Sequence, residues 1–390
     1  MIGTLSGGGA ERVISNLSLN WDKNMEKNII MFGSNAKIDY PIDGNLINID
    51  KNEIKNIKDK VFNLIYRVNE IKKIKKENPN SEIISFLEYP NLLNLLTRKY
   101  GKTIISVRNH MSSKHNKGIK SYFWNSTIKY LYGRADKIIV VSEEIKNDLV
   151  LNYKIKEDKI KVIYNSYPIN EIRRLATEQI ENQYNEIFNG NVIISAGRVK
   201  PQKAHWHLIR AFSKVKENVK DSKLVILGEG ELKEELIELS RKLNIEKDVY
   251  FLGFKKNVFK YINASEVFVL SSLFEGFPNA LVEAMSCGVP VISSDCLSGP
   301  REILSPQEFN VNNIQYGILE NRYGILVPVC DGIRSYNREL TNEEIIMAES
   351  IISILTNTDL KDEFSKKSIL RAKEFEINEI IKQWEELIVL

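Results

Sequence analysis

The chain has 390 residues, of which 43% are hydrophobic and 27% charged, and its formal net charge is +4. This length and composition suffice for two or three domains with buried cores. There is no apolar run of about 18 residues and no apolar segment in the glycine-rich start, so we expect neither a membrane-spanning helix nor a signal peptide. Three cysteines without metal-ligand spacing are typical of a reduced compartment, and we therefore expect a cytoplasmic protein.

Short apolar runs alternate with amphipathic stretches along the chain, which predicts repeated strand–helix units and parallel sheets. In the first half, strands are expected at 28–32, 82–86, 103–107, 137–141 and 161–164, and helices at 57–77, 89–99, 119–133 and 143–151. In the second half, strands are expected at 192–196, 223–227, 248–251, 267–270, 289–293 and 325–327, and helices at 341–357, 359–374 and 376–388. The polar stretch between about 165 and 191 has no strand pattern and is interpreted as a linker.

Three consecutive glycines, Gly7, Gly8 and Gly9, follow a very short apolar start. Either the first strand is truncated or Met1 is not the biological start. Glycine tolerates positive φ angles and lets a ligand approach the backbone closely. A helix is expected from Ala10 onward, and helix N-termini bind anions. A flexible turn has the same composition, so the cluster is a weak signal on its own.

Two cations, Arg198 and Lys203, follow the apolar run at 192–196 and precede an expected helix. An arginine offers a planar fork to phosphate oxygens and a lysine a compact charge. The positive end of the helix adds to their field. Taken in isolation, this pattern is typical of two solvated surface cations, with a phosphate site as the alternative.

Two carboxylates, Glu275 and Glu283, stand eight positions apart in the second half. Glu275 is expected on the loop after the strand at 267–270, and Glu283 just over one turn inside a helix that begins near Asn279. Parallel sheets bind ligands at the carboxyl ends of their strands, and carboxylates suit a ligand rich in hydroxyls. The apolar neighbours of Glu283 argue against a solvated side chain, because a charge among them needs a partner.

Taken together, these segments resemble the retaining nucleotide-sugar glycosyltransferases of family 4, which have the GT-B fold. The resemblance spans nearly the whole chain and rests on segments in family order at 7–12, 196–212, 227–230, 275–283 and 323–327. It implies an α/β protein with two Rossmann-like parallel-sheet domains that face each other across a cleft. The implied parts are an N-terminal domain at 1–168, a linker at 169–190, a donor-binding domain at 191–375, and a terminal helix at 376–390 that crosses back to the N-terminal domain.

The resemblance also implies roles for individual residues. Arg198 and Lys203 stabilise the charge that grows on the donor diphosphate, and Glu283 holds the ribose hydroxyls. The donor is lined by Gly8, Gly9, Phe254, Glu275, Gly276, Phe277, Pro278, Asn279 and Leu281. Either Arg108 or His110, at the end of the strand at 103–107, faces the sugar. The register leaves both open, and a surface-loop histidine is the alternative.

No metal or other cofactor is expected. The chain lacks the Asp-x-Asp metal motif of the other main transferase fold, and Arg198 and Lys203 take the place of a divalent cation. The family commonly has Gly after this lysine, where this chain has Ala204. His205 and His207 stand two positions apart without a third ligand nearby, so zinc ligation is not expected.

The charge is unevenly distributed, with a net charge of +10 in residues 1–168 and −6 in the remainder. A basic half suggests an anionic partner, such as a membrane surface or a phosphorylated acceptor, although lysine-rich surfaces without a partner explain it equally well. Basic amphipathic stretches at 55–76 and 114–134 are candidates for contact with anionic lipid. The aromatic-rich second stretch is the stronger candidate, because the first also fits a helix packed on the sheet. No nucleic-acid motif is present.

We therefore predict an enzyme on the inner face of the cell membrane. It transfers a hexose or N-acetylhexosamine with retention, from a nucleotide donor of the UDP class, to a glycan on a lipid carrier in polysaccharide or glycoconjugate biosynthesis. One alternative is a sugar-nucleotide epimerase or phosphorylase of the same fold, which the order Arg198, Lys203, Glu275, Glu283 disfavours. Another is a non-catalytic partner subunit of a glycosyltransferase complex.

Overall fold

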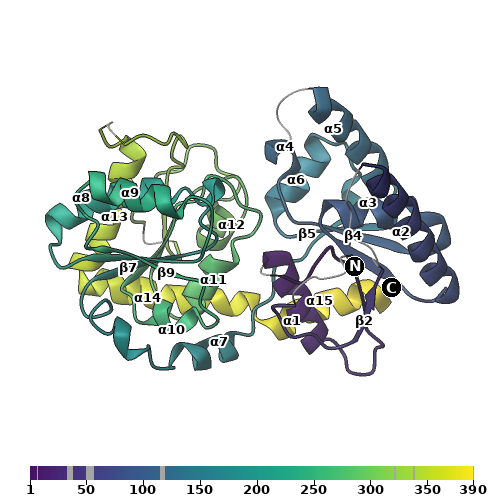
Figure 1. Ribbon diagram of the computed structural model, residues 1–390, viewed down its shortest axis with the longest axis horizontal. Helices are drawn as coiled ribbons and strands as arrows, with labels where there is room; N and C mark the ends of the chain where they lie inside the picture. The colour runs from purple at the N-terminus through teal and green to yellow at the C-terminus, as the bar shows by residue number, and fades with distance from the viewer. Residues whose placement is uncertain are drawn as a thin grey trace. The chain divides into compact units, whose positions relative to one another are not determined.

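The computed structural model describes residues 1–6, 8–32, 38–49, 57–114, 119–319, 322–336 and 339–389. The chain divides into two compact units (Figure 1). Unit 1 comprises Met1–Ser166 together with Ile377–Leu390, and unit 2 comprises Tyr167–Glu376. Each unit is built on parallel strands, as the alternation of strand and helix patterns predicted.

Unit 2 contains a six-stranded parallel sheet with the order β12-β11-β10-β7-β8-β9. Its strands are β7 (Val192–Ala196), β8 (Lys223–Leu227), β9 (Val249–Gly253), β10 (Val267–Leu270), β11 (Val291–Ser294) and β12 (Ile325–Val327). From β7 the sheet grows in one direction through β8 and β9, and in the other through β10 to β12. This is a Rossmann-like order, and the direction reverses between β7 and β10, where such sheets bind their ligands.

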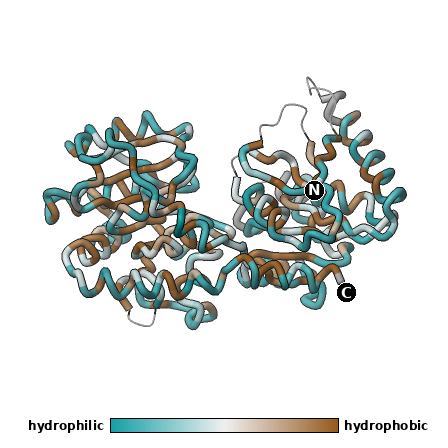
Figure 2. The backbone as a smooth tube through the Cα atoms, turned by 90° about the horizontal axis from the view of Figure 1, so that it is seen from below, coloured by the Kyte–Doolittle hydropathy of each residue, from teal (hydrophilic) through white to brown (hydrophobic). Residues whose placement is uncertain are grey.

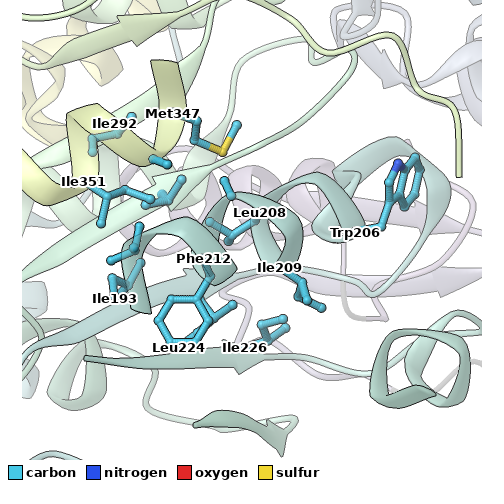
Figure 3. Close-up of a cluster of buried hydrophobic side chains, with 14 of the residues drawn as sticks. Ile193, Trp206, Leu208, Ile209, Phe212, Leu224, Ile226, Ile292, Met347 and Ile351 are labelled. Carbon is cyan, nitrogen blue, oxygen red and sulfur yellow. The ribbon is translucent and has the colours of Figure 1, made fainter. Parts of the chain in front are cut away.

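Helices cover both faces of this sheet (Figure 1). One face carries α8 (His205–Asn218), α9 (Lys233–Lys242) and α13 (Asn342–Thr356), and the other carries α7 (Ile169–Ala176), α10 (Phe259–Asn263), α11 (Asn279–Ser286) and α14 (Thr358–Ala372). The short helix α12 (Pro300–Leu304) follows β11. Figure 3 shows Phe212 of α8 between strand residues such as Leu224 and residues of α13 such as Ile351, all of them fully buried. This packing fixes α8, whose first turn follows the loop after β7.

Unit 1 has a parallel pair, β1 (Asn28–Met31) with β2 (Asn45–Asn48), and a four-stranded parallel sheet in the order β3 (Ile83–Phe86), β4 (Thr103–Val107), β5 (Lys137–Val140), β6 (Ile160–Val162). The start of the chain joins them. The amide of Ile2 donates to Ile30 O at 3.0 Å, and the terminal amine of Met1 donates to Ile84 O at 2.6 Å. The short apolar start therefore lies between β1 and β3.

Seven helices with described bounds surround these strands: α1 (Gly9–Asn20), α2 (Ile57–Glu77), α3 (Glu88–Leu96), α4 (Met111–Lys114), α5 (Ile119–Tyr132), α6 (Glu143–Leu151) and α15 (Ile377–Val389). The terminal helix α15 packs on α1, and its hydrophobic residues appear in brown near the label C in Figure 2. Trp384 of α15 is 1% exposed, with ring centroids 6.0 Å from Phe86 and 6.4 Å from Trp21. These contacts make α15 part of the core of unit 1.

Three segments differ from their expected form. The stretch at 169–190, expected as a linker, contains α7, which buries Ile169 and Ile172 and packs on α10 and α11 within unit 2. The helix expected at 89–99 is divided into α3 and a 3-10 turn at Arg98–Tyr100. Strand β2 was not expected, because only two of its four residues, Leu46 and Ile47, are apolar. Of the helices that the structure describes, none is both long and apolar enough to cross a membrane.

Candidate functional site

The loops after β7 and β10 bring Lys203 and Glu275 together at the point where the strand order of unit 2 reverses. Lys203 ends a 3-10 turn (Pro201–Lys203), and its Nζ donates to Glu275 Oε1 at 2.6 Å. Ser272 Oγ donates to the same carboxylate oxygen at 2.6 Å. The side chains of Lys203 and Glu275 are only 17% and 9% exposed. The sequence predicted each residue for the donor site, but it did not predict that the two would form an ion pair.

Main-chain contacts hold these two loops against each other. Leu273 N donates to Gln202 O at 2.9 Å, and Ser271 Oγ donates to Lys203 O at 2.9 Å. The side-chain amide of Gln202 donates from Nε2 to Phe274 O at 2.9 Å. The ion pair is therefore held by a braced backbone on both sides, which limits the freedom of both charged side chains. The sequence signal for this brace was weak, because it consists of short polar residues next to a strand end.

The loop that carries Arg198 packs against the segment after β8, which contains Gly228 and Gly230. Gly197 N donates to Leu227 O at 2.9 Å, and Val199 N donates to Glu229 O at 3.0 Å. A Cβ atom on Gly228 would lie 2.0 Å from Gly197 O, and one on Gly230 would lie 2.2 Å from Val199 O. The two backbones thus approach as closely as only glycine permits. Arg198 lies between these contacts with an exposed side chain.

Helix α8 begins two residues after Lys203, with Ala204 as its N-cap. Ala204 takes a left-handed conformation with φ 47°, and His205 then starts the helix at 2% exposure. Burial, followed by the charge of Lys203, lowers the pKa of His205 to about 3, so the imidazole is neutral near pH 7. Its Nδ1 has no hydrogen-bond partner among the residues that the structure describes. The N-terminus of α8 is therefore bordered by one ammonium group and one uncharged imidazole.

The loop from Glu275 into α11 is fixed at several points. Ser298 Oγ donates to Gly276 O at 2.6 Å, and the Tyr167 hydroxyl donates to Asn279 Oδ1 at 2.7 Å. The Phe277 ring meets the Phe375 ring edge-on, with centroids 5.5 Å apart. Pro278 is buried, and a Cβ atom on the neighbouring Gly299 would lie 2.6 Å from its Cδ. These contacts fix the main chain of this loop.

Two further residues of α11, Leu281 and Glu283, are buried at 0% and 4% exposure. Burial, followed by the carboxylate of Glu283, raises the pKa of the Cys287 thiol to about 12. The position of Glu283 in α11 and its burial confirm the prediction that it lies about one turn inside a helix among apolar neighbours. Phe254, expected beside the nucleotide base, lies directly after β9 and is 72% exposed.

In unit 1, Gly8 caps α1 and Gly9 is the first residue of that helix. The Glu11 carboxylate lies over Gly8, since a Cβ atom there would be 2.0 Å from Glu11 Oε2. A carboxylate in the first turn is stabilised by the helix dipole. The N-terminus that the sequence suggested for a ligand anion is thus next to an anion of the chain itself. Gly7 lies outside the described residues.

The two candidates after β4, Arg108 and His110, are both held by neighbours in unit 1. Arg108 is 8% exposed and donates to Asn165 Oδ1 and, at 3.4 Å, to Ser106 Oγ. His110 has Nδ1 3.7 Å from Asp148 Oδ2 and Nε2 3.7 Å from a carboxylate oxygen of Glu144. A small cavity at the ends of β3 and β4 is lined by Leu87, Glu88, Asn91, Ser106, Val107, Arg108, Asn109, Met111 and Tyr132. Arg108 lines this cavity and His110 does not.

In the described ranges, no group of three or more His, Cys, Asp or Glu side chains is arranged to hold a metal ion. His207 is fully buried in α8, with Nδ1 2.6 Å from Glu344 Oε1. Arg210 Nε donates to the same oxygen at 2.9 Å. These contacts tie α13 to α8, so His207 has a structural role.

Comparison with known proteins relates both halves of the chain to transferases. The family model described as Glycosyltransferase Family 4 matches residues 7–171, and that described as Glycosyl transferases group 1 matches residues 176–316. An uncharacterized glycosyltransferase of Methanocaldococcus jannaschii is 38% identical over 84% of each chain. An N-acetylgalactosaminyltransferase of Campylobacter jejuni, named for a diphospho-undecaprenol substrate, is 31% identical over 96% of this chain and 94% of its own.

Solved structures show the same fold. The crystal structure of Anabaena HepE, in complex with UDP and glucose, superposes with a TM-score of 0.74 at 17% identity, over 100% of this chain and 98% of that one. The sucrose-phosphate synthase of Thermosynechococcus elongatus superposes with the same TM-score and identity, over 99% of this chain and 94% of its own. At this level of identity, the likeness concerns the fold alone.

Proposed function

This chain belongs to the glycosyltransferases with the GT-B fold, and we propose that it transfers a hexose or N-acetylhexosamine from a UDP donor to a glycan on a lipid carrier. The observation that carries the proposal is the placement of Lys203 and Glu275, 2.6 Å apart, at the reversal point of the unit 2 sheet. Ligands bind at this point in Rossmann-like sheets. The adjacent Arg198 and the N-terminus of α8 make the same edge suitable for a diphosphate.

In this proposal the donor diphosphate lies against the loop after β7. Its charge grows as the bond to the sugar breaks, and preorganised cations stabilise that charge most effectively. Lys203 exchanges part of its contact with Glu275 for a phosphate oxygen, while the exposed Arg198 side chain closes on the diphosphate. Glu275 then accepts hydrogen bonds from sugar hydroxyls, and the buried Glu283 holds the ribose. The two cations supply the charge that a divalent metal supplies in other transferases, so the reaction proceeds without metal.

The reaction retains the α-configuration of the donor. The acceptor oxygen bonds to C1 on the face from which the phosphate departs, the bond between C1 and the phosphate oxygen breaks, and the acceptor proton passes to that phosphate. No protein nucleophile is required by this route. Glu275 is a poor nucleophile in any case, because its Oε1 accepts hydrogen bonds from both Lys203 and Ser272.

Relatives support the choice of donor and acceptor. Two Campylobacter jejuni relatives, 31% and 24% identical, are named as N-acetylgalactosaminyltransferases acting on undecaprenol-linked glycans. Anabaena HepE shares the fold, with a TM-score of 0.74 to this chain, and its crystal structure was solved in complex with UDP-glucose. A UDP-sugar and a polyprenyl-linked glycan are therefore the substrates to test first.

The test is nucleoside diphosphate release from a panel of UDP- and GDP-sugars, with a membrane lipid extract as acceptor, in the presence and absence of EDTA. We expect release from one UDP-sugar, unchanged by EDTA and lost in Lys203→Ala and Glu275→Ala. Binding of UDP without any turnover would overturn the catalytic proposal in favour of a partner subunit. Absence of nucleotide binding would overturn the assignment of the site itself.

A further inference from the structure

The chain passes between its two units twice, and the two crossing segments lie side by side where unit 2 begins and ends. Unit 2 begins at Tyr167 and ends at Glu376. The main-chain amide of Tyr167 donates to Phe375 O at 3.0 Å, and Tyr167 forms an isolated parallel bridge with Glu376. Tyr167 and Phe375 are 2% and 1% exposed. The first and last segments of unit 2 are therefore joined to each other by their main chains.

The first crossing segment also holds the loop between β10 and α11. Residues 275–279 of this loop, which we call the donor loop, line the donor in the proposed function. The Tyr167 hydroxyl donates to Asn279 Oδ1 at 2.7 Å, across 112 positions of the chain. Asn279 is the first residue of α11, so this bond fixes the point at which the donor loop enters the helix. Loss of a buried hydrogen bond is costly, because the remaining partner stays without the water that it had in the unfolded chain.

The second crossing segment supports the same loop through aromatic packing. The rings of Phe277 and Phe375 meet edge-on at 72°, with centroids 5.5 Å apart, a geometry that stabilises beyond the burial of apolar area. The guanidinium carbon of Arg371 lies 4.9 Å from the centre of the Phe375 ring. Arg371 is itself fixed, because it donates to Ile303 O at 2.9 Å and to Glu302 O at 2.6 Å. Phe277 of the donor loop therefore rests on a ring that is itself held in place.

These contacts form a closed ring that starts and ends on the donor loop. It runs from Asn279 to Tyr167, continues along the main-chain bond to Phe375, and returns through Phe277. We propose that Tyr167 and Phe375 are positioning residues of the donor loop, and that the ring couples occupation of the donor site to the order of both crossing segments. Neither residue contacts the donor in this scheme, since both act through the loop. A ligand that rigidifies a loop also restrains the segments that are packed on it.

The hydroxyl of Tyr167 distinguishes this arrangement from ordinary packing. A phenylalanine ring would fill the same space, so it is the hydrogen bond to Asn279 that requires an oxygen here. Tyr261 of α10 offers a comparison within unit 2. It is 1% exposed, and its hydroxyl donates to a carboxylate oxygen of Glu181, outside the donor loop. The two tyrosines are equally buried and differ in their partner, which makes Tyr261 the matched control.

The test uses the full chain, with calorimetric titration of UDP and hydrogen exchange in the presence and absence of UDP. Tyr167→Phe removes the hydroxyl and keeps the ring, and Tyr261→Phe does the same at the control position. Asn279→Ala and the double variant with Tyr167→Phe complete a double-mutant cycle, which isolates the coupling between the two side chains. A purely structural role of Tyr167 would lower stability without changing how UDP affects exchange in the crossing segments.

We expect UDP to slow exchange in the donor loop and in both crossing segments, around Tyr167 and around Phe375. In Tyr167→Phe the effect on the crossing segments should be lost, and the Kd for UDP should rise roughly three- to tenfold. Asn279→Ala should raise the Kd by a similar factor, and the double variant should exceed the weaker single variant by less than about twofold. Tyr261→Phe should keep both the affinity and the exchange pattern of the unmodified chain.

The inference rests on the proposed function, and turnover of UDP-sugars is therefore measured separately on the same proteins. Slowed exchange confined to the donor loop, or multiplicative effects on Kd in the cycle, would overturn the coupling while the proposed function stands. Coupling to UDP without any turnover would support the positioning role and overturn the catalytic proposal. Absence of UDP binding would overturn both, because there would be no occupied donor site to couple.

Discussion

Lys203 and Glu275 stand 72 positions apart in the chain, yet Lys203 Nζ lies 2.6 Å from Glu275 Oε1. Each follows the carboxyl end of a different strand, β7 or β10, and these strands are neighbours in the sheet. The pair therefore marks the reversal point of the fold with two opposite charges. In the proposed reaction, the donor diphosphate therefore competes with Glu275 for the ammonium group of Lys203.

The first prediction concerns that ammonium group. Lys203→Ala should lower kcat/KM by about 10²- to 10³-fold, because a preorganised positive charge at the departing diphosphate is lost. The measurement is nucleoside diphosphate release under saturating acceptor. Lys200→Ala is the matched control, since Lys200 is an exposed lysine on the same loop, and it should change the rate less than about threefold. Equal losses in both variants would indicate a general field effect and contradict a specific contact.

A second prediction separates binding from turnover at Glu275. Glu275→Gln preserves the shape of the side chain and removes the charge that competes for Lys203. UDP affinity should therefore be unchanged or increased, while kcat falls by about 10²-fold, since the amide is a weaker acceptor for sugar hydroxyls than a carboxylate. Calorimetric titration with UDP and steady-state kinetics measure the two effects. A loss of UDP affinity matching the loss of kcat would show that Glu275 mainly supports the structure of the loop.

The third prediction concerns the close backbone approach behind Arg198. Gly230→Ala places a methyl group where Val199 O lies 2.2 Å away, so the loop has to move. We expect a loss of about 1–3 kcal/mol in the free energy of unfolding, together with weaker UDP binding. Gly3→Ala is the control, because its added Cβ has no atom within 4 Å among the described residues other than its chain neighbours. Urea denaturation gives the stability of both, and an unaffected Gly230→Ala protein would contradict the described packing.

A fourth prediction follows from the buried His205. Burial, and then Lys203, lower its pKa from 6.5 to about 3 in the folded state. Between pH 6.5 and about 3, His205 binds a proton in the unfolded chain but not in the folded chain. The free energy of unfolding therefore has its full value above pH 6.5 and decreases as the pH drops toward 3. Between pH 7.5 and 4.5, the unmodified chain should lose about 3 kcal/mol more than His205→Leu. Urea denaturation at the two pH values measures these losses. If the unmodified chain and His205→Leu lost the same free energy of unfolding, His205 would be protonated in the folded chain.

The fifth prediction tests the attachment of α15. Trp384→Ala removes a ring packed between Phe86 and Trp21, and should cost unit 1 about 3–5 kcal/mol of unfolding free energy. Hydrogen exchange should increase in α1 and α15, while unit 2 keeps its protection and its UDP affinity. Leu370→Ala, at a residue of α14 that is 59% exposed, serves as control. Increased exchange confined to unit 2 would contradict the assignment of α15 to unit 1.

The alternation of strands and helices was predictable because buried parallel strands such as Val192–Ala196 are continuous apolar runs. Strand β2 was missed since Asn45–Asn48 contains only two apolar residues, and pairing with β1 rather than its own sequence holds it in the sheet. The burial of Glu283 followed from its apolar neighbours. The pairing of Lys203 with Glu275 could not be predicted, because it depends on which strands are adjacent. The same limit applies to Arg108, whose partner Asn165 lies 57 positions away.

The placement of α15 in the core of unit 1 makes that unit discontinuous in sequence, with all of unit 2 inserted between its parts. During translation, residues 167–376 emerge before the helix that completes the core around Trp384. A nascent chain can therefore fold unit 2 while the apolar surface of unit 1 that packs against α15 is still exposed. Until α15 has been synthesised, we expect the exposed apolar surface of unit 1 to bind chaperones.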